Sequence, residues 1–145
     1  MPTMTPPPDA PTDQTDPAAL VATMPFAVAT GVEIDHATAE EVTGGMDWAA
    51  QRCTIGDVLH GGALMVLADS LGAVCAFLNL PEGAVTSTIE SKTNFFRGLR
   101  GGGRAHATST PLHVGRTTIV VQTDIRDDRD RRLALVTQTQ AVIAL

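Results

Sequence analysis

The fold is indicated most strongly by residues 56–73, which read Gly56-Asp-Val-Leu-His60-Gly61-Gly62-Ala-Leu-Met-Val-Leu-Ala-Asp69-Ser-Leu-Gly-Ala73. Apart from His60, the glycines, Asp69 and Ser70, every residue from Leu59 to Leu78 is apolar, and Pro81 follows shortly after. The length, the many alanines and leucines, and the proline beyond the end predict one helix over Leu59–Leu78. A helix that is apolar on nearly all faces is typically buried. Asp69 and Ser70 at its middle argue against a membrane span.

Strands are predicted on both sides of this helix. Before the helix these are Pro25–Asp35, which is apolar with β-branched residues, and Ala39–Trp48, which Gly44 and Gly45 interrupt. After the helix, valine, threonine and isoleucine are frequent in Ala84–Phe96, Arg104–Val114, Arg116–Arg126 and Arg132–Leu145. Short turns with glycine or aspartate separate the last four, which predicts an antiparallel meander. We therefore expect an α+β fold in which a curved antiparallel sheet wraps around one long central helix.

The length of 145 residues suits one domain with a core and is too short for two ordinary ones. Six of the nine prolines lie within the first 17 residues, so we expect residues 1–22 to form a disordered, proline-rich tail and residues 23–145 the single domain. Residues 1–20 carry no lysine, arginine or apolar run, which argues against a secretory signal peptide and predicts a cytoplasmic protein.

The composition argues against several functional classes. A net charge of -6 and an aromatic content of 3%, with Trp48 as the one tryptophan and no tyrosine, are unlike a nucleic-acid binder. Cys53 and Cys75 are too few for a four-ligand zinc site. Their spacing permits a disulfide, but two free thiols in a reducing compartment are the preferred interpretation.

The charges are distributed unevenly along the chain. Eight acidic residues and no basic ones precede Arg52, whereas nine basic and four acidic residues lie between Lys92 and Arg132. The arginines within 126–132 alternate with aspartates, so we interpret them as solvated loop charges. For the four arginines beside glycines, phosphate binding and ordinary surface charge both remain open; these are Arg97, Arg100, Arg104 and Arg116.

The predicted helix begins with a pattern that suits carbonyl chemistry. Gly61 and Gly62 leave backbone N–H groups unobstructed at the positive end of the helix dipole, where they can stabilise an oxyanion, and His60 can add a hydrogen bond. Asp69 is a carboxylate in an apolar environment, which favours a base or nucleophile. The alternatives are a purely structural helix start at His60 and a structural Asp69 bonded to Ser70.

Helix geometry separates these two candidate groups. His60 and Asp69 are nine residues apart, which corresponds to about 13.5 Å along the axis and roughly half a revolution around it. They cannot meet on one face of one helix. If both serve one active site, Asp69 must come from a second copy of the chain, across a two-fold interface.

The order of elements and the segment His60-Gly61-Gly62, six residues, Ala68-Asp69 resemble the hotdog-fold acyl-CoA thioesterases. The similarity is to the phenylacetate-pathway type, related to the 4-hydroxybenzoyl-CoA thioesterases, and covers residues 25–145. The turn His113–Thr117 and the hairpin Asp124–Asp130 also resemble that family. The resemblance implies a hotdog fold and an enzyme that hydrolyses the thioester of an aryl-, phenylacetyl- or medium-chain acyl-CoA.

The resemblance also implies roles for individual residues. The N–H of Gly61 would hold the thioester carbonyl, with His60 and Gly62 beside it, and Asp69 of the other protomer would activate water or attack directly. Ser87 stands where some relatives position the water. Thr54 replaces an asparagine or glutamine that many relatives carry six residues before the histidine, and a hydroxyl cannot reproduce both amide functions. Gln51 is a candidate to compensate.

The resemblance further implies what the protein binds. Coenzyme A enters as part of the acyl-CoA substrate, with no metal and no separate cofactor. Its phosphates would contact arginines beside glycines, namely Arg97, Arg100 and Arg116 with Gly115, and the candidate aromatic lining of the acyl pocket is Phe77, Phe95 and Phe96. We expect a homodimer at minimum and a homotetramer as the assembly, with neither nucleic acid nor membrane as partner.

Two alternative functions remain open. A hotdog hydratase acting on enoyl thioesters also uses an aspartate and a histidine, but about five residues apart, so the spacing of nine fits poorly. A non-catalytic acyl-CoA sensor or scaffold would keep the pocket and lose the chemistry. Asp69 argues against that interpretation, and Thr54 leaves it open.

Overall fold

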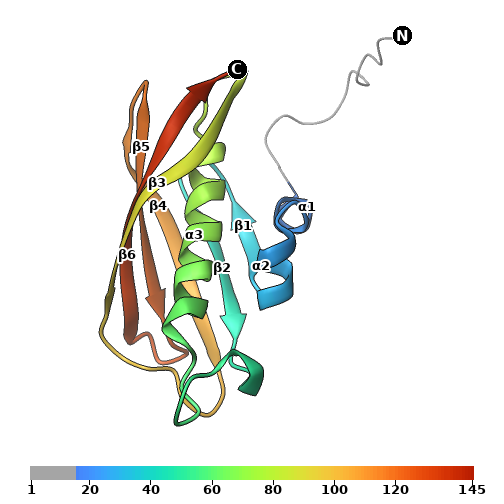
Figure 1. The fold of residues 1–145 in the computed structure, drawn as a ribbon, viewed down its shortest axis with the longest axis vertical. Helices are drawn as coiled ribbons and strands as arrows, with labels where there is room; N and C mark the ends of the chain where they lie inside the picture. The colour runs from blue at the N-terminus through green and yellow to red at the C-terminus, as the bar shows by residue number, and fades with distance from the viewer. Residues whose placement is uncertain (1–15) are drawn as a thin grey trace, which may run out of the picture.

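The 17-residue helix α3 (Gly61–Phe77) lies against a curved six-stranded sheet that wraps around it (Figure 1). The computed structural model describes residues 16–145. Helix α3 contacts all six strands, and its residues Leu67, Ala68 and Leu71 have no solvent exposure. The buried central helix predicted for Leu59–Leu78 is therefore confirmed, with its first turn at Gly61.

Local interactions define both ends of α3. His60 precedes the helix with an extended backbone, and its Nδ1 accepts the N–H of Gly62 at 2.8 Å. This bond satisfies one of the donors that the first turn of a helix leaves without a partner. At the other end the helix stops at Phe77, and the side chain of Asn79 donates to the carbonyl of Cys75 at 2.8 Å. Both ends are thus held by side chains that adjoin the helix.

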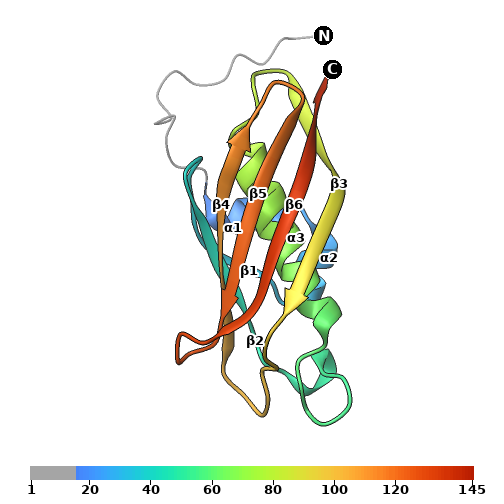
Figure 2. The same cartoon turned by 90° about the vertical axis from the view of Figure 1, so that its left-hand side faces the viewer.

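All strands pair antiparallel, in the order β1-β2-β4-β5-β6-β3 (Figure 2). They are β1 (Glu33–Ala37), β2 (Val42–Asp47), β3 (Ala84–Phe95), β4 (Arg104–Val114), β5 (Thr118–Arg126) and β6 (Arg132–Ala144). Strands β4 to β6 form consecutive hairpins, as predicted. The predicted meander is wrong for β3, which pairs with β6 because β2 occupies the free side of β4. The loop 96–103 therefore carries the chain from the edge strand β3 to the interior strand β4.

The segment before β1 is partly helical, which corrects the strand predicted over Pro25–Asp35. Helix α2 (Pro25–Thr30) occupies its first half, and strand begins only at Glu33. Pro25 stands in the first turn, where its missing N–H costs nothing, and Gly31 ends the helix with a left-handed φ of 85°. These two helix signals outweigh the β-branched residues between them.

Helix α1 (Pro17–Ala22) corrects the boundary of the predicted tail. Asp16 caps this helix by accepting the N–H of Ala18 at 3.0 Å, and Leu20 is buried in the core. Residues 17–22 therefore belong to the folded part of the chain. The remainder of the predicted tail, residues 1–15, lies outside the described residues.

Cys53 and Cys75 are free thiols, as predicted. Cys75 lies in α3 without solvent exposure, and burial raises the pKa of its thiol to about 11. The thiol therefore stays protonated at neutral pH and acts as a small apolar group in the core.

A short 3₁₀ turn (Ala50–Arg52) interrupts the loop between β2 and α3. Among residues 16–145, the structure contains no helix long and apolar enough to cross a membrane.

Candidate functional site

The start of α3 presents a backbone donor that is free to bind a ligand. Gly62 donates its N–H to the His60 imidazole, and Ala63 donates to the His60 carbonyl at 2.9 Å. The N–H of Gly61 makes no hydrogen bond to any residue within 16–145. A free N–H at the positive end of a helix dipole can stabilise the negative charge that develops on a carbonyl oxygen.

The two glycines at this end leave little room for side chains. A Cβ at Gly61 would lie 3.2 Å from the ring of Phe95, and a Cβ at Gly62 would lie 2.9 Å from Nδ1 of His60. Gly61 lines a pocket together with Thr54, Phe95 and Arg97, among others. The structure thus brings three predicted site residues together around the free N–H: Thr54, Gly61 and Arg97.

Gln51 does not join Thr54 in that pocket. Gln51 lines a different pocket, which it shares with His60, Gly62 and Phe26 of α2. The backbone N–H of Thr54 donates to the carbonyl of Val58 at 2.8 Å, and this bond fixes the loop that carries Thr54 into the pocket of Gly61. Within the protomer Gln51 therefore adjoins His60 and not the free N–H of Gly61.

Asp69 lies on a face of α3 that the sheet leaves uncovered, and its side chain is exposed in the protomer. The expectation of a carboxylate surrounded by apolar residues is therefore wrong for a single chain. Met65, one turn earlier, is 44% exposed, and both residues line a groove between α2 and β3. The cause is the sheet, which covers only part of the circumference of α3 (Figure 1).

Two side-chain donors hold Asp69. Thr88 of β3 donates its hydroxyl to Oδ1 of Asp69 at 2.9 Å, and Gln138 of β6 donates Nε2 to the same oxygen at 3.2 Å. Neither residue was a sequence candidate. A signal for one of them exists, because Gln138 and Gln140 interrupt an otherwise apolar alternation on β6.

Ser87, the predicted water-positioning residue, does not contact Asp69 within the protomer. Its neighbours Thr86 and Thr88 both hydrogen-bond to the buried Gln140. Because side chains alternate along a strand, Ser87 points to the opposite face of the sheet from α3. Thr88 is the β3 residue that reaches Asp69.

One protomer does not bring Asp69 to the helix start. Helix α3 runs without interruption from Gly61 to Phe77, so Asp69 lies eight residues, or about 12 Å along the axis, beyond Gly61. The separation expected from the sequence is therefore present in the folded chain.

The arginines of the loop 96–103 have different environments. Arg97 is exposed beside Gly61 and Phe95 and has no ion-pair partner in the described chain. Arg100 donates Nη1 to the carbonyl of Gly56 at 2.8 Å, which ties this loop to the one before α3. Arg97 thus lines the pocket of the free N–H, and Arg100 partly serves the loop structure.

Gly115 and Arg116 lie in the turn between β4 and β5, at the other end of the sheet from Arg97 (Figure 1). The 11 residues of β4 separate the two regions by about 33 Å. One protomer therefore does not gather Arg97 and Arg116 around one ligand. Any shared coenzyme site needs Arg116 from another copy.

Arg104 is committed to structural ion pairs. Its guanidinium contacts Glu33 at 3.2 Å, Asp35 at 3.2 Å and Asp47 at 3.3 Å. Burial alone would lower the pKa of Arg104, but these three carboxylates outweigh burial and raise the pKa above its ordinary value. Of the two interpretations left open for Arg104, phosphate binding and ordinary surface charge, the ion pairs favour the second. Arg104 is a structural charge that joins β1, β2 and β4.

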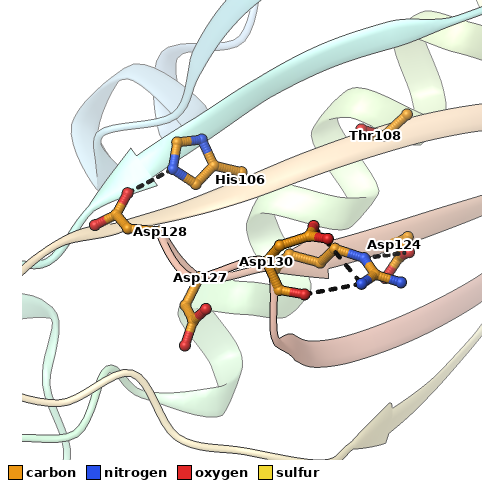
Figure 3. Close-up of a pocket in the computed structure, with 7 residues that line it drawn as sticks. His106, Thr108, Asp124, Asp127, Asp128 and Asp130 are labelled. Atoms are coloured by element: carbon orange, nitrogen blue, oxygen red, sulfur yellow. Dashed lines mark hydrogen bonds and ion pairs between the residues drawn. The ribbon is translucent and has the colours of Figure 1, made fainter.

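A further pocket, at the β5–β6 hairpin, is lined by His106 and several aspartates (Figure 3). Its carboxylates are occupied by arginines and by His106. Asp124 binds Arg126 and Arg132 at 2.9 Å each, and His106 lies 2.7 Å from Asp128. The sequence predicts solvated loop charges for this hairpin, whereas in the structure Arg126, Arg131 and Arg132 form ion pairs with its aspartates.

The sequence profile of the thioesterase superfamily matches residues 56–134. A curated relative from Pseudomonas aeruginosa is 31% identical over 116 residues, which is 79% of each chain. The 1,4-dihydroxy-2-naphthoyl-CoA hydrolase of Escherichia coli is 34% identical over 86 residues, 59% of this chain and 62% of that one. The chain spans 56% and 63% of the length of two other curated relatives, from Vibrio cholerae and Haemophilus influenzae.

Solved structures of the same architecture exist. A mutant thioesterase of Pseudomonas aeruginosa superposes with a TM-score of 0.85 at 28% identity, over 92% of this chain and 98% of that one. A mutant of the phenylacetic acid degradation protein PaaI of Thermus thermophilus superposes with a TM-score of 0.73 at 26% identity, over 83% and 99% of the two chains. The predicted hotdog fold is confirmed.

The hairpin aspartates lead to a prediction about acid stability. Burial alone would raise the pKa of Asp127, but hydrogen bonds from Arg131 and from the N–H of Arg129 lower it below its ordinary value of 3.8. A lowered pKa in the folded state adds stability above the unfolded value, and this stability is lost as the pH falls through the folded pKa. We expect Asp127→Asn to lower the melting temperature at pH 7, with the difference from wild type shrinking below pH 3.8.

Thermal unfolding followed by circular dichroism between pH 7 and pH 2.5 measures this effect. Glu82→Gln, an exposed site in the loop before β3, is the matched control and should leave the melting temperature unchanged. A difference between Asp127→Asn and wild type that stays constant down to pH 2.5 contradicts the charge-based explanation.

Proposed function

The chain belongs to the thioesterase superfamily, and on this premise we propose that it hydrolyses acyl-CoA thioesters to a free acid and coenzyme A. The observation that carries the proposal is the free N–H of Gly61 at the start of a buried helix, beside an open pocket. A thioester carbonyl placed there would develop its negative charge against this donor and the helix dipole. His60 is exposed, and because its Nδ1 accepts the N–H of Gly62, the neutral imidazole carries its proton on Nε2 and can donate it.

In the proposed reaction Asp69 supplies the base or the nucleophile. As a base it takes a proton from water, whose oxygen bonds to the thioester carbon while the oxyanion rests on Gly61. The carbon–sulfur bond then breaks, and the thiolate of coenzyme A takes a proton. In the direct alternative the carboxylate attacks the carbon itself, and the carbon–sulfur bond breaks to release the thiolate of coenzyme A, which takes a proton. Water then hydrolyses the resulting anhydride to the free acid and restores Asp69.

We propose that two copies of the chain form each active site. The support is the separation of about 12 Å between Gly61 and Asp69 on one helix. The edge strand β3 is 12 residues long, unpaired on its outer side, and carries Val85 and Ile89 with 39% and 63% exposure. A long apolar edge is normally covered by another strand. A homodimer paired through β3 would cover it, and a homotetramer would be a dimer of such dimers.

The coenzyme phosphates are proposed to contact Arg97, with Arg100 beside it. In an antiparallel pairing of two β3 edges, opposite ends of the two sheets come together. This pairing would bring Gly115 and Arg116 of the second copy toward the end of the sheet that holds Arg97. Thr54 and Gly62 would border the thioester, and Ser87 remains a candidate only for a role across the dimer. No cofactor other than the coenzyme A of the substrate is proposed.

The acyl group is proposed to be aryl, phenylacetyl or medium-chain. Phe95 and Phe96 line the pocket at Gly61 and are exposed to a ligand, which suits an aromatic or aliphatic group. Phe77 lies 16 residues further along α3 and does not line that pocket. The relative named as a 1,4-dihydroxy-2-naphthoyl-CoA hydrolase agrees with an aryl substrate.

Removing the charge of Asp69 is expected to abolish turnover. Asp69→Asn keeps the shape and loses the base, and loss of a general base typically costs about 10²-fold to 10⁴-fold in rate. Thiol release from a panel of aryl- and alkyl-CoAs measures the effect, and Asp130→Asn in the β5–β6 hairpin is the control. Near wild-type kcat in Asp69→Asn would refute the mechanism. Acyl-CoA binding without hydrolysis by the wild type would favour a sensor.

Mixing two inactive variants tests the shared site. Asp69→Asn lacks the base, and Gly61→Val obstructs the N–H beside Phe95. After subunit exchange, each heterodimer should contain one intact composite site, and its activity should approach half that of a wild-type dimer. Exchange verified by native mass spectrometry without recovered activity would contradict the shared site.

Arg97 is expected to act on the coenzyme and not on the acyl group. Arg97→Ala should raise KM for acyl-CoA, and added salt should narrow the difference from wild type because it screens charge. A thioester truncated at pantetheine lacks the phosphates and should be hydrolysed equally well by both proteins. Arg129→Ala is the control for loss of one surface charge. Equal impairment with the truncated substrate would contradict the assignment.

A further inference from the structure

Two glutamines occupy core positions on β6, on the face that packs against α3. Gln138 is 1% exposed and Gln140 is fully buried, between the apolar positions Val136 and Val142 on the same face. Burying an amide costs free energy unless it forms hydrogen bonds. Their position in the core therefore calls for an explanation.

The hydrogen bond to Asp69 allows only one orientation of the Gln138 amide, with its nitrogen toward the carboxylate. Its Nε2 donates to Oδ1 of Asp69 at 3.2 Å, whereas its buried Oε1 has no hydrogen-bond partner in the described chain. A carboxylate accepts hydrogen bonds and cannot donate them, so the amide can face Asp69 only through its nitrogen. The bond to the carboxylate thus sets the orientation of Gln138.

Gly72 makes room for this amide. A Cβ at Gly72 would overlap the side-chain amide of Gln138. Gly72 lies within α3, one turn beyond Asp69, and is itself buried. A glycine inside a helix costs about 1 kcal/mol relative to alanine. The glycine at position 72 therefore leaves the space that the side-chain amide of Gln138 occupies.

Gln140 acts on Asp69 only through Thr88. Its Nε2 donates to Oγ1 of Thr88 at 2.6 Å, and the Thr88 hydroxyl in turn donates to Oδ1 of Asp69 at 2.9 Å. Both direct donors, from Thr88 and Gln138, converge on the same oxygen. Oδ2 of Asp69 makes no hydrogen bond to residues 16–145, and Asp69 lines the groove.

A bulge in β3 keeps other charges away from this carboxylate. The register of β3 against β6 shifts between Thr88 and Glu90, so that Ser91 pairs with Gln138 on the helix side. Glu90 pairs with Thr139 and falls on the outer face. The groove residues from α2, α3 and β3 around Asp69 include no second titratable side chain.

We infer that Gln138, admitted by Gly72, is a positioning residue for Asp69. It fixes Oδ1 from the core side, so that Oδ2 points into the groove where water or a thioester would meet it. The inference rests on the proposed function, because it assigns Gln138 to the base of that reaction. Displacing a reacting group by about 1 Å can cost on the order of 10²-fold in rate.

Steady-state kinetics of Gln138→Met test the inference. Methionine has a similar length and no donor, so kcat should fall about tenfold or more while KM and the melting temperature stay near wild type. Thr123→Val is the control for loss of a buried polar group, because Thr123 of β5 is fully buried and bonds to Ser109 and not to Asp69 or its donors, so kcat should fall less than threefold. Gly72→Ala keeps the amide but displaces it, and should reproduce the loss of kcat.

A measurement without catalysis complements the kinetics. The side-chain amide protons of Gln138, observed by NMR, should be protected from exchange in wild type and should lose that protection in Asp69→Ala. The corresponding protons of Gln140 should change less. This readout tests the contact even if Gln138→Met does not fold or the protein has no thioesterase activity.

The outcomes separate the two proposals. An inactive wild type, or an active Asp69→Asn, would overturn the proposed function. The NMR measurement would still test whether Gln138 holds Asp69, because it does not depend on catalysis. An active wild type with inactive Asp69→Asn and unchanged kcat in Gln138→Met overturns the positioning role. Equal losses in Gln138→Met and Thr123→Val also overturn it, because they indicate general damage to the core.

Discussion

The burial of one apolar helix is the constraint on which the rest of the structure depends. Helix α3 carries leucine, alanine and valine around most of its circumference, and Leu67, Ala68 and Leu71 are fully excluded from water. Burying an apolar side chain of leucine size contributes about 1.5–3 kcal/mol. A single layer of sheet can cover such a helix only by curving around it, and the six strands do so (Figure 2).

This arrangement determines where polar chemistry can occur. The sheet leaves the start of α3 and one stripe along its length open, and the polar groups of the helix lie there. The free N–H of Gly61 is at the open end, and the carboxylate of Asp69 is on the open stripe. Because the packed faces hold α3 rigidly, both groups keep fixed directions. Two turns of helix keep them apart, which is why a second copy enters the proposed mechanism.

Three polar residues on the helix side of β3 and β6 are linked to Asp69. Gln138, Gln140 and Thr88 form a chain of hydrogen bonds that ends on one oxygen of the carboxylate. By contrast, the charged residues far from α3, such as Arg104 and the hairpin aspartates, are satisfied by partners in neighbouring strands. The buried polar groups and the surface ion pairs thus have different physical causes, although both are networks of charge and hydrogen bonds.

The sequence by itself determined the central helix, the positions of most strands and the glycine-rich start of the helix at Gly61, because these depend on local signals. Apolar runs, alternating β-branched residues and a His-Gly-Gly helix start act over a few residues. Only the tertiary structure decided that β3 pairs with β6, that Asp69 is exposed in the protomer, and that Thr88 and Gln138 reach it. These facts depend on strand register and on which face the sheet leaves open, and the two contacts join residues 19 and 69 positions apart in the sequence.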